Sequence, residues 1–235
     1  MKTVGIIPAR LNSTRLPNKP LVDIHGKPMI QHVYERALKS NLDNVIVACD
    51  DEKVFDTVIS FGGQASMTSR SHINGTTRIA EVAKKLTADF IINIQGDEPL
   101  ITAEVINDLL EEIDKEVNVI TLKHKLNCDH DIDNPNNVKV ITDNNNYAIY
   151  FSRSRIPYNR NQFTEYYKHI GIYGYKREFL LKYVNMPSTK LEMTESLEQL
   201  RILENGYKIK VIETEHSLLG VDTEEDLKVV RRILK

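Results

Sequence analysis

Near its N-terminus the chain carries the stretch TVGIIPARLNSTRLPNKPL, Thr3 to Leu21, which indicates the kind of fold. A short apolar run, Val4 to Ile7, ends at Pro8, and such a run is typical of a buried strand. The loop after it carries three cations: Arg10, Arg15 and Lys19. Ligands of open α/β sheets bind at the carboxyl ends of the strands. We therefore predict that this loop binds a polyphosphate; three solvated surface cations are the alternative.

Downstream of this loop, strand-like and helix-like segments alternate. Asn44 to Cys49 is a continuous β-branched run and Phe90 to Gln95 is a second apolar run, so both are predicted to be core strands. Helices are predicted after Pro28, between Asp51 and Gly62, and from Thr76 to Leu86. Strands and helices that alternate through short connections form right-handed βαβ units. The chain is therefore predicted to be an α/β protein with a mainly parallel central sheet flanked by helices.

From Val117 onward the pattern changes, because four strand-like segments follow one another with few helical residues between them. They cover residues 117–126, 137–143, 147–153 and 169–175. Helices at 176–184 and 191–203, a strand at 207–213 and a last helix at 224–234 complete the chain. We predict a single domain over residues 1–235, in which residues 117–175 form an antiparallel excursion inserted into the α/β layer.

The composition limits the classes of ligand and compartment. The net charge is −2, so the surface as a whole carries no excess of positive charge for nucleic acid or an anionic membrane. Cys49 and Cys128 form neither a disulfide framework nor a metal-binding spacing. No run approaches the ~20 apolar residues of a membrane span, and the first residues resemble a strand rather than a signal peptide. We expect a cytoplasmic protein that binds neither nucleic acid nor a membrane.

Acidic residues at strand ends are candidate metal ligands. Asp97 follows a predicted strand directly, and Asp222 precedes the last helix. Mg²⁺ takes one or two carboxylates together with phosphate oxygens and waters, so these two residues are predicted to hold it. For Asp222 a helix N-cap is the alternative. The adjacent residues Asp50 and Asp51 point their side chains apart, which favours a helix cap over a metal site.

The segment SHINGTTR, Ser71 to Arg78, places Asn74 and Gly75 before a helix start. Backbone groups in such a turn can contact the edge of a base, and Arg78 can pair with an acid inside the protein. Neither a Walker A pattern nor a Gly-x-Gly-x-x-Gly fingerprint occurs in the chain. Side chains, more than glycine amides, must therefore carry the charge of a phosphate site.

An ordered series of motifs resembles the 3-deoxy-manno-octulosonate (KDO) cytidylyltransferases over nearly the whole chain. The N-terminal half carries PARxxSTRLPxKPL at 8–21, GKPMIQHVYERA at 26–37, MTS at 67–69 and NIQGDEPLI at 93–101. The C-terminal half carries YFSR at 150–153, KHIGIYGY at 168–175, ESLEQLRILENGYKI at 195–209 and GVDTEEDL at 220–227. The KHIGIY and ESLEQLR segments distinguish this family from the related sialate cytidylyltransferases.

The resemblance implies a Rossmann-like nucleotidyltransferase domain that assembles as a homodimer through the antiparallel excursion. It implies a Mg²⁺-dependent reaction in which CTP and KDO give CMP-KDO and pyrophosphate, for lipopolysaccharide or capsule synthesis. The residues implied to bind the nucleotide are Ala9, Arg10, Arg15, Lys19, Asn74, Gly75 and Arg78. Those implied to bind the sugar are Gln95, Arg153, His169, Tyr173, Glu198 and Gln199. The residues implied to carry the catalysis are Arg10, Lys19, Asp97 and Asp222.

Alternatives stand beside these assignments. Glu198 and Gln199 are adjacent on the helix predicted over residues 191–203, where Glu198 would otherwise be a surface acid. His169 would otherwise be a core residue bonded to the backbone. The other candidate functions are a cytidylyltransferase for an amino-substituted octulosonate or a nonulosonate, a nucleotide-sugar glycosyltransferase with a metal pair at Asp50 and Asp51, and a nucleotide-binding module without catalysis.

Two residues depart from the family pattern. Asn18 replaces the usual glycine, and because asparagine tolerates a left-handed backbone, the turn is expected to form. Thr77 replaces the usual aspartate beside Arg78, so it can cap a helix but cannot neutralise the guanidinium. We expect this second change to bear on the affinity for the sugar more than on the affinity for CTP.

Overall fold

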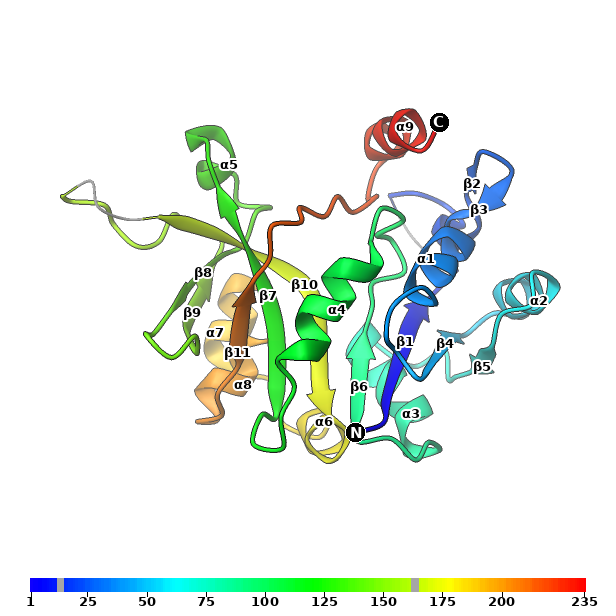
Figure 1. Ribbon diagram of the computed structural model, residues 1–235, viewed down its shortest axis with the longest axis horizontal. Helices are drawn as coiled ribbons and strands as arrows, with labels where there is room; N and C mark the ends of the chain where they lie inside the picture. Colours follow the sequence, from blue (N-terminus) through cyan, green and yellow to red (C-terminus); the bar gives the residue numbers. More distant parts are fainter. Residues whose placement is uncertain (12–14, 162–164) are drawn as a thin grey trace.

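The computed structural model describes residues 1–11, 15–161 and 165–235, and within them nine strands form one sheet (Figure 1). β1 (Thr3–Ala9) pairs in parallel with β4 (Asn44–Cys49) on one side and with β6 (Phe90–Asn93) on the other. β5 (Ala65–Met67) adds a further parallel strand beside β4. The predicted α/β fold with its mainly parallel sheet is confirmed. Residues 12–14 of the cation loop lie outside the described residues.

β1 extends further than predicted, because the strand continues through Pro8 to Ala9. Proline has no backbone N–H to donate. Pairing with β6 ends at Ile6, whose carbonyl accepts from the N–H of Ile94, whereas pairing with β4 extends to Ala9. The backbone nitrogen of Pro8, like the backbone of Ile6, faces the β6 side of the strand. Pairing with β6 has ended there, so the missing N–H of Pro8 leaves no hydrogen bond unmade.

The predicted antiparallel region does not form a sheet of its own, because its strands belong to the nine-stranded sheet, and β7 (Val119–Leu126) and β10 (Tyr166–Lys176) lie in its continuous row. β10 runs antiparallel between β6 and β7, and β11 (Lys210–Glu213) pairs with β7 in parallel. β8 (Lys139–Thr142) and β9 (Ala148–Ser152) pair with each other, and β8 meets β10 at Lys168. β10 therefore joins the parallel half of the sheet to the excursion.

Helices cover both faces of the sheet. α1 (Met29–Ala37), α2 (Glu52–Ser60) and α4 (Ala103–Glu111) share one buried apolar cluster with β1, β4 and β6. α3 (Gly75–Lys84), α6 (Arg177–Tyr183) and α8 (Leu200–Glu204) share a second cluster with the same strands. Ile7 belongs to the first cluster and Ile6 to the second, because successive strand residues point to opposite faces.

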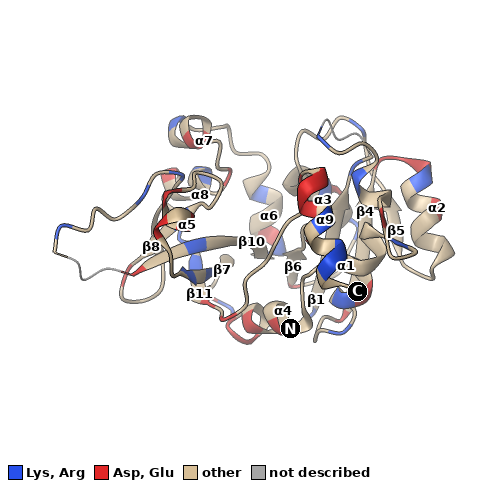
Figure 2. Ribbon diagram, turned by 90° about the horizontal axis from the view of Figure 1, so that it is seen from above, with Lys and Arg blue, Asp and Glu red and all other residues tan. Residues whose placement is uncertain are grey.

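Short elements complete the fold. A 3-10 helix, η1 (Lys19–Leu21), precedes a two-stranded antiparallel sheet of β2 (Asp23–Ile24) and β3 (Lys27–Pro28), and α5 (Asp129–Asp133) precedes β8. α9 (Glu224–Ile233) has acidic residues in its first turn and basic residues in its last (Figure 2), which suits the helix dipole. Among the described residues no helix has the length and apolar character needed to cross a membrane.

The single helix predicted over residues 191–203 is wrong, because two helices occupy it: α7 (Lys190–Glu195) and α8. Ser196 between them is left-handed, at φ 53°, and Leu197 turns into the second apolar cluster. The left-handed backbone at Ser196 ends the first helix there. Glu198 and Gln199 therefore lie in the connection, where Gln199 is the N-cap of α8.

Candidate active site

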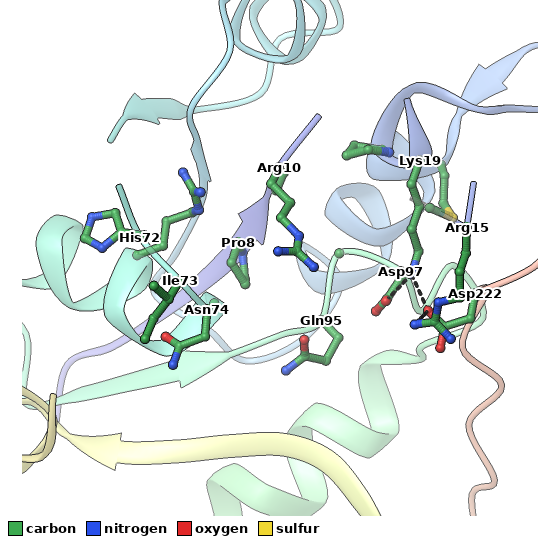
Figure 3. Close-up of a pocket in the computed structure, with 16 residues that line it drawn as sticks. Pro8, Arg10, Arg15, Lys19, His72, Ile73, Asn74, Gln95, Asp97 and Asp222 are labelled. Carbon is green, nitrogen blue, oxygen red and sulfur yellow. Dashed lines mark hydrogen bonds and ion pairs between the residues drawn. The ribbon is translucent and has the colours of Figure 1, made fainter. Parts of the chain in front are cut away.

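In the described part of the chain, two cavities lie at the carboxyl ends of β1 and β6. The large cavity, of about 360 Å³, is lined by the loops after β1 and β6, the start of α3 and Asp222 (Figure 3). The small cavity has a volume of about 170 Å³. Its lining residues are Thr76, Asn93, Gln95, Tyr173, Tyr175, Ser196, Leu197, Glu198 and Gln199. Gln95 lines both cavities, so they adjoin.

All residues that the resemblance implied for the nucleotide line the large cavity: Ala9, Arg10, Arg15, Lys19, Asn74, Gly75 and Arg78. Asp97 and Asp222 line it too. Figure 3 shows the Arg10 guanidinium between Pro8 and Asp97, and Lys19 extending to the two carboxylates. The structure therefore brings together residues from four separate parts of the sequence.

Lys19 joins the two carboxylates that were predicted to hold a metal. Its ammonium donates to Asp97 Oδ2 at 2.5 Å and to Asp222 Oδ1 at 2.8 Å. Arg15 contacts the same oxygen of Asp222 at 3.0 Å. The lysine side chain is only 14% exposed, so its charge-assisted hydrogen bonds are largely removed from bulk water.

Local backbone geometry places these residues. Asn18, before η1, is left-handed at φ 54°, as predicted for a residue in the glycine position. Gly96 is needed because a Cβ at this position would lie 2.8 Å from a backbone oxygen of β1. The N–H of Val221 donates to the carbonyl of Asp97 at 2.8 Å. This bond brings Asp222 beside Asp97.

The alternative role of Asp222, as the cap of α9, is wrong. Thr223 caps this helix, because its hydroxyl accepts from the N–H of Asp226 while the Asp226 carboxylate accepts from the N–H of Thr223. This reciprocal capping box satisfies the helix terminus without Asp222. The carboxylate of Asp222 is directed to the large cavity instead.

Asn74 caps α3. Its Oδ1 accepts from both the N–H and the hydroxyl of Thr77, each at 2.9 Å. Because its oxygen is used in this way, the amide hydrogens of Asn74 remain to contact Glu198 across the start of the helix. Gly75 packs tightly on Pro8, where a Cβ would lie 3.1 Å from the proline ring. The helix N-terminus therefore faces the cavities with its donors, which favours anions.

Arg78 pairs with an interior acid, as predicted, and the acid is Asp50. Its guanidinium donates to Asp50 Oδ2 and to Thr68 Oγ1, each at 2.7 Å. Asp51 caps α2 by accepting from the N–H of Lys53. The cap prediction is therefore confirmed for Asp51 and wrong for Asp50. Because Asp50 is bonded to Arg78 and Asp51 to the N–H of Lys53, the two carboxylates do not form the metal-binding pair that the glycosyltransferase alternative required.

Glu198 is the acidic group of the small cavity. Its Oε2 accepts from the hydroxyl of Thr76 at 2.8 Å. Burial raises the pKa of the Glu198 carboxyl above its usual range, and hydrogen bonds from Thr76 and Asn74 oppose part of that rise. The interpretation of Glu198 as a surface acid is therefore wrong. Gln199 and Tyr173 line the same cavity, as the resemblance implied.

His169 is not among the described residues that line either cavity, but its ring lies 5.3 Å from that of Tyr173, which lines the small one. Burial, with a smaller effect of the Lys168 ammonium, lowers the pKa of His169 to about 3, so the imidazole is neutral near pH 7. The Thr121 hydroxyl donates to carbonyls of β10 and lies 3.1 Å from His169 Nε2. Nε2 therefore donates to this hydroxyl, and Nδ1 remains an acceptor.

The two other residues implied for the sugar differ in their placement. The amide of Gln95 donates to a carbonyl of β10 at 3.1 Å, which holds it on the wall between the cavities. Arg153 is not among the described residues that line either cavity. Its guanidinium donates to the carbonyls of Pro135, Glu195 and Ser196. Arg153 therefore holds the connection between α7 and α8, and its contact with the sugar stays a prediction.

Asp97 and Asp222 fit a divalent cation, because their carboxylates already converge on one positive group. The adjacent Glu98 adds little charge, since burial and the neighbouring Asp97 raise its pKa to about 8. Across the described ranges no cluster of three or more His, Cys, Asp or Glu is suited to a metal. A cation held by the two aspartates would take its other ligands from phosphates and water, as Mg²⁺ does.

Sequence reasoning did not find every residue of these cavities. Thr76 and Asn93 line the small cavity, and Asp50 orients Arg78. Asn93 interrupts the apolar run FIINI, and a polar side chain in a buried strand is a signal that points to a site. Thr76 carries no comparable signal, because its partner Glu198 lies 122 residues away. Asp50 is evident from the sequence as an acid at a strand end, but its pairing with Arg78, 28 residues away, is not.

Comparisons with known proteins agree with the geometry. The model of the Cytidylyltransferase family matches residues 4–209. The 3-deoxy-manno-octulosonate cytidylyltransferase of Fusobacterium nucleatum subsp. nucleatum is 62% identical and covers 100% of this chain and 98% of its own. The protein of the same name from Trichlorobacter lovleyi is 49% identical, with coverages of 100% and 99%.

A solved structure adds to this similarity. The structure of a CMP:2-keto-3-deoxy-manno-octonic acid synthetase complexed with CTP has a TM-score of 0.96 and 46% identity. It covers 100% of this chain and 98% of its own. A match of this quality extends over both cavities. The chain belongs to the family of the 3-deoxy-manno-octulosonate cytidylyltransferases.

Proposed function

We propose that this protein transfers CMP from CTP to the anomeric hydroxyl of KDO, giving CMP-KDO and pyrophosphate. The observation that carries the proposal is the pair of cavities that adjoin at Gln95. The large cavity concentrates cations, and the small cavity has aromatic and hydrogen-bonding walls. A triphosphate in the first and a sugar in the second would meet at the carboxyl end of β6.

The cations of the large cavity suit a triphosphate. Arg10, Arg15 and Lys19 together offer positive charge over several phosphate groups, and each arginine can donate two parallel hydrogen bonds. At the start of α3, Asn74 and Gly75 add donors beside the positive end of the helix dipole.

The reaction is an in-line displacement at the α-phosphorus. A bond forms between the anomeric oxygen and phosphorus, the bond from phosphorus to the oxygen of the β-phosphate breaks, and pyrophosphate leaves. Negative charge accumulates on the leaving group, so Arg10, Arg15 and Lys19 act by position and by charge neutralisation.

Asp97 and Asp222 would hold Mg²⁺ in this reaction. Bound there, the ion would polarise phosphate oxygens and make the attacking hydroxyl easier to ionise. Lys19 orients both carboxylates through its two hydrogen bonds. Arg15 restrains Asp222 from the other side.

The small cavity offers a sugar both donors and acceptors of hydrogen bonds. Glu198 accepts from the hydroxyl of Thr76, and the Gln199 amide both donates and accepts. Such a wall suits the hydroxyl groups of an ulosonate. Arg153 would release the main-chain carbonyl of Ser196 and bind the sugar's carboxylate instead. A guanidinium can donate two parallel hydrogen bonds to the two oxygens of a carboxylate.

Pyrophosphate release from CTP tests the proposal. With Mg²⁺ present, KDO is expected to support release, and ATP in place of CTP is expected to support little. The same assay with amino-substituted octulosonates and nonulosonates ranks the sugars. No release with any ulosonate would overturn the proposed activity, and faster release with another ulosonate would overturn the assignment to KDO.

The proposal extends to assembly and location. We expect a homodimer, with contact through the excursion, where Ile149 and Tyr158 are exposed. Light scattering during size-exclusion chromatography measures this state, and a monomer at micromolar concentration would contradict it. Synthesis of CMP-KDO for lipopolysaccharide or capsule from cellular CTP fits a cytoplasmic location.

A further inference from the structure

The buried side chain of Asn93 has no role in the reaction as derived so far. It lies at the end of β6, directly opposite Tyr173 of β10, which is the neighbouring strand in Figure 1. The three residues before it in β6 are buried and apolar. Asn93 is only 3% exposed, and it lines the small cavity. A polar side chain therefore replaces an apolar one where the strand reaches the cavity.

The amide oxygen of Asn93 is an unused acceptor. In the described part of the structure neither Asn93 Oδ1 nor the Tyr173 hydroxyl has a hydrogen-bond partner. A buried polar atom without a partner destabilises the folded protein, so folded proteins rarely retain one without a reason. Gln95, two residues further on, differs because its amide is bonded to a carbonyl of β10.

The surroundings of Asn93 define what can satisfy it. The carboxyl of Glu198 also lines the small cavity, and its Oε2 accepts from the hydroxyl of Thr76. An amide oxygen without a partner favours a group that donates and disfavours a carboxylate. Asn93 Oδ1 therefore suits the hydroxyl-bearing part of an ulosonate, with its carboxylate directed away from β6.

We propose that Asn93 Oδ1 accepts a hydrogen bond from a hydroxyl group of the bound ulosonate and is a specificity-determining residue of this enzyme. The inference rests on the proposed function, because it concerns the same sugar cavity. In the unliganded protein the unpartnered buried oxygen destabilises the fold. When the sugar binds, its hydroxyl supplies the missing hydrogen bond, and this contributes to binding.

Asn93→Leu tests this assignment, because leucine has a similar size and removes the acceptor. We expect kcat/KM for the ulosonate to fall roughly 5- to 150-fold, the range for one hydrogen bond of this kind. The KM for CTP is expected to stay within about twofold. The melting temperature is expected to stay equal or rise, since no hydrogen bond of the unliganded protein is lost.

Thr214→Val is the matched control. Thr214 is also buried at the end of a strand, but its hydroxyl donates to Asp108 at 2.6 Å, away from both cavities. This variant is expected to lose stability and to keep both KM values. The two variants thus separate an acceptor reserved for the substrate from an ordinary buried hydrogen bond.

Ulosonate analogues that each lack one hydroxyl complete the test. The wild-type protein is expected to discriminate against one analogue, and Asn93→Leu to lose that discrimination. If the wild type is active and the variant keeps its kcat/KM for every sugar, this inference is overturned while the proposed function stands. Failure of both Asn93→Leu and Asn93→Ala to fold would also overturn it. Inactivity of the wild type with all ulosonates would overturn both.

Discussion

The two cavities differ in how their buried polar side chains are satisfied. In the large cavity the buried cations are bonded to acidic side chains: Lys19 to Asp97 and Asp222, and Arg78 to Asp50. In and beside the small cavity, burial disfavours charge, and one amide oxygen lacks a partner. Burial lowers the pKa of His169 and raises that of Glu198, and Asn93 Oδ1 has no partner in the described structure.

This difference follows from the cost of burial. An isolated buried charge is far more costly than an unpartnered amide oxygen, so the cations need counter-charges before the ligand arrives. A triphosphate is expected to exchange such partners and to bind with strong dependence on salt. A sugar instead fills vacant hydrogen-bonding positions, and its recognition is expected to depend little on salt.

The largest expected effect is loss of the carboxylates in the large cavity. Asp97→Asn or Asp222→Asn is expected to lower kcat at least about a thousandfold with the fold intact, because several kcal/mol of charge stabilisation are lost and each 1.4 kcal/mol is tenfold. Steady-state pyrophosphate release measures this. Near-normal turnover in either variant would contradict the assignment of these residues to the metal.

Asp51→Asn is the control for these carboxylates. Asp51 also follows a strand, but it caps α2 and does not line the large cavity. Its replacement is expected to affect stability by at most about 1 kcal/mol and to leave turnover unchanged.

The next effect is expected at Asp50, which neutralises Arg78. Arg78 is 3% exposed, so Asp50→Asn leaves a buried guanidinium without its counter-charge. We expect the free energy of unfolding to fall by roughly 1.5–3 kcal/mol, the range for a hydrogen bond to a charged group. Relative to the wild type, the KM for CTP is expected to rise more than the KM for the sugar. Urea unfolding and the two KM values measure this. An unchanged KM for CTP would show that the pair serves the fold alone.

A smaller effect is expected at Thr76, which positions Glu198 through its hydroxyl. Thr76→Val keeps the shape and removes one hydrogen bond worth about 1 kcal/mol, so the KM for the sugar is expected to rise about fivefold. The KM for CTP is expected to stay constant. Thr76→Ser retains the hydroxyl and is expected to restore the wild-type value. A serine variant as impaired as the valine variant would contradict positioning through the hydroxyl.

The smallest effect is expected at Thr77, which bonds to Asn74 at the start of α3. Thr77→Asp removes this bond and places a carboxylate beside Asn74, which contacts Glu198, so the KM for the sugar is expected to rise two- to threefold. The helix dipole favours the new carboxylate by about 0.3–1 kcal/mol, so stability is expected to hold. Equal changes in the KM values of sugar and CTP would count against a sugar-specific effect.

Local patterns in the sequence were enough for the parallel half of the fold. The apolar runs of β1, β4 and β6, the cap at Asp51 and the start of α3 after Asn74 were predicted from neighbouring residues alone. The cations of the first loop were likewise found by their place after β1. Such features depend on periodicity and turn chemistry, which act over a few residues.

The tertiary structure alone decided which of these groups meet. Lys19 and Asp222 are 203 residues apart, and Thr76 and Glu198 are 122 apart. The insertion of β10 into the sheet, and the break at Ser196 that buries Leu197, also depend on distant packing. The spacing of residues along the chain does not predict such long-range contacts. The sequence alone determined the strands of the parallel half, the cap at Asp51 and the presence of cations in the first loop. Packing between distant segments brought these residues together around two adjoining cavities.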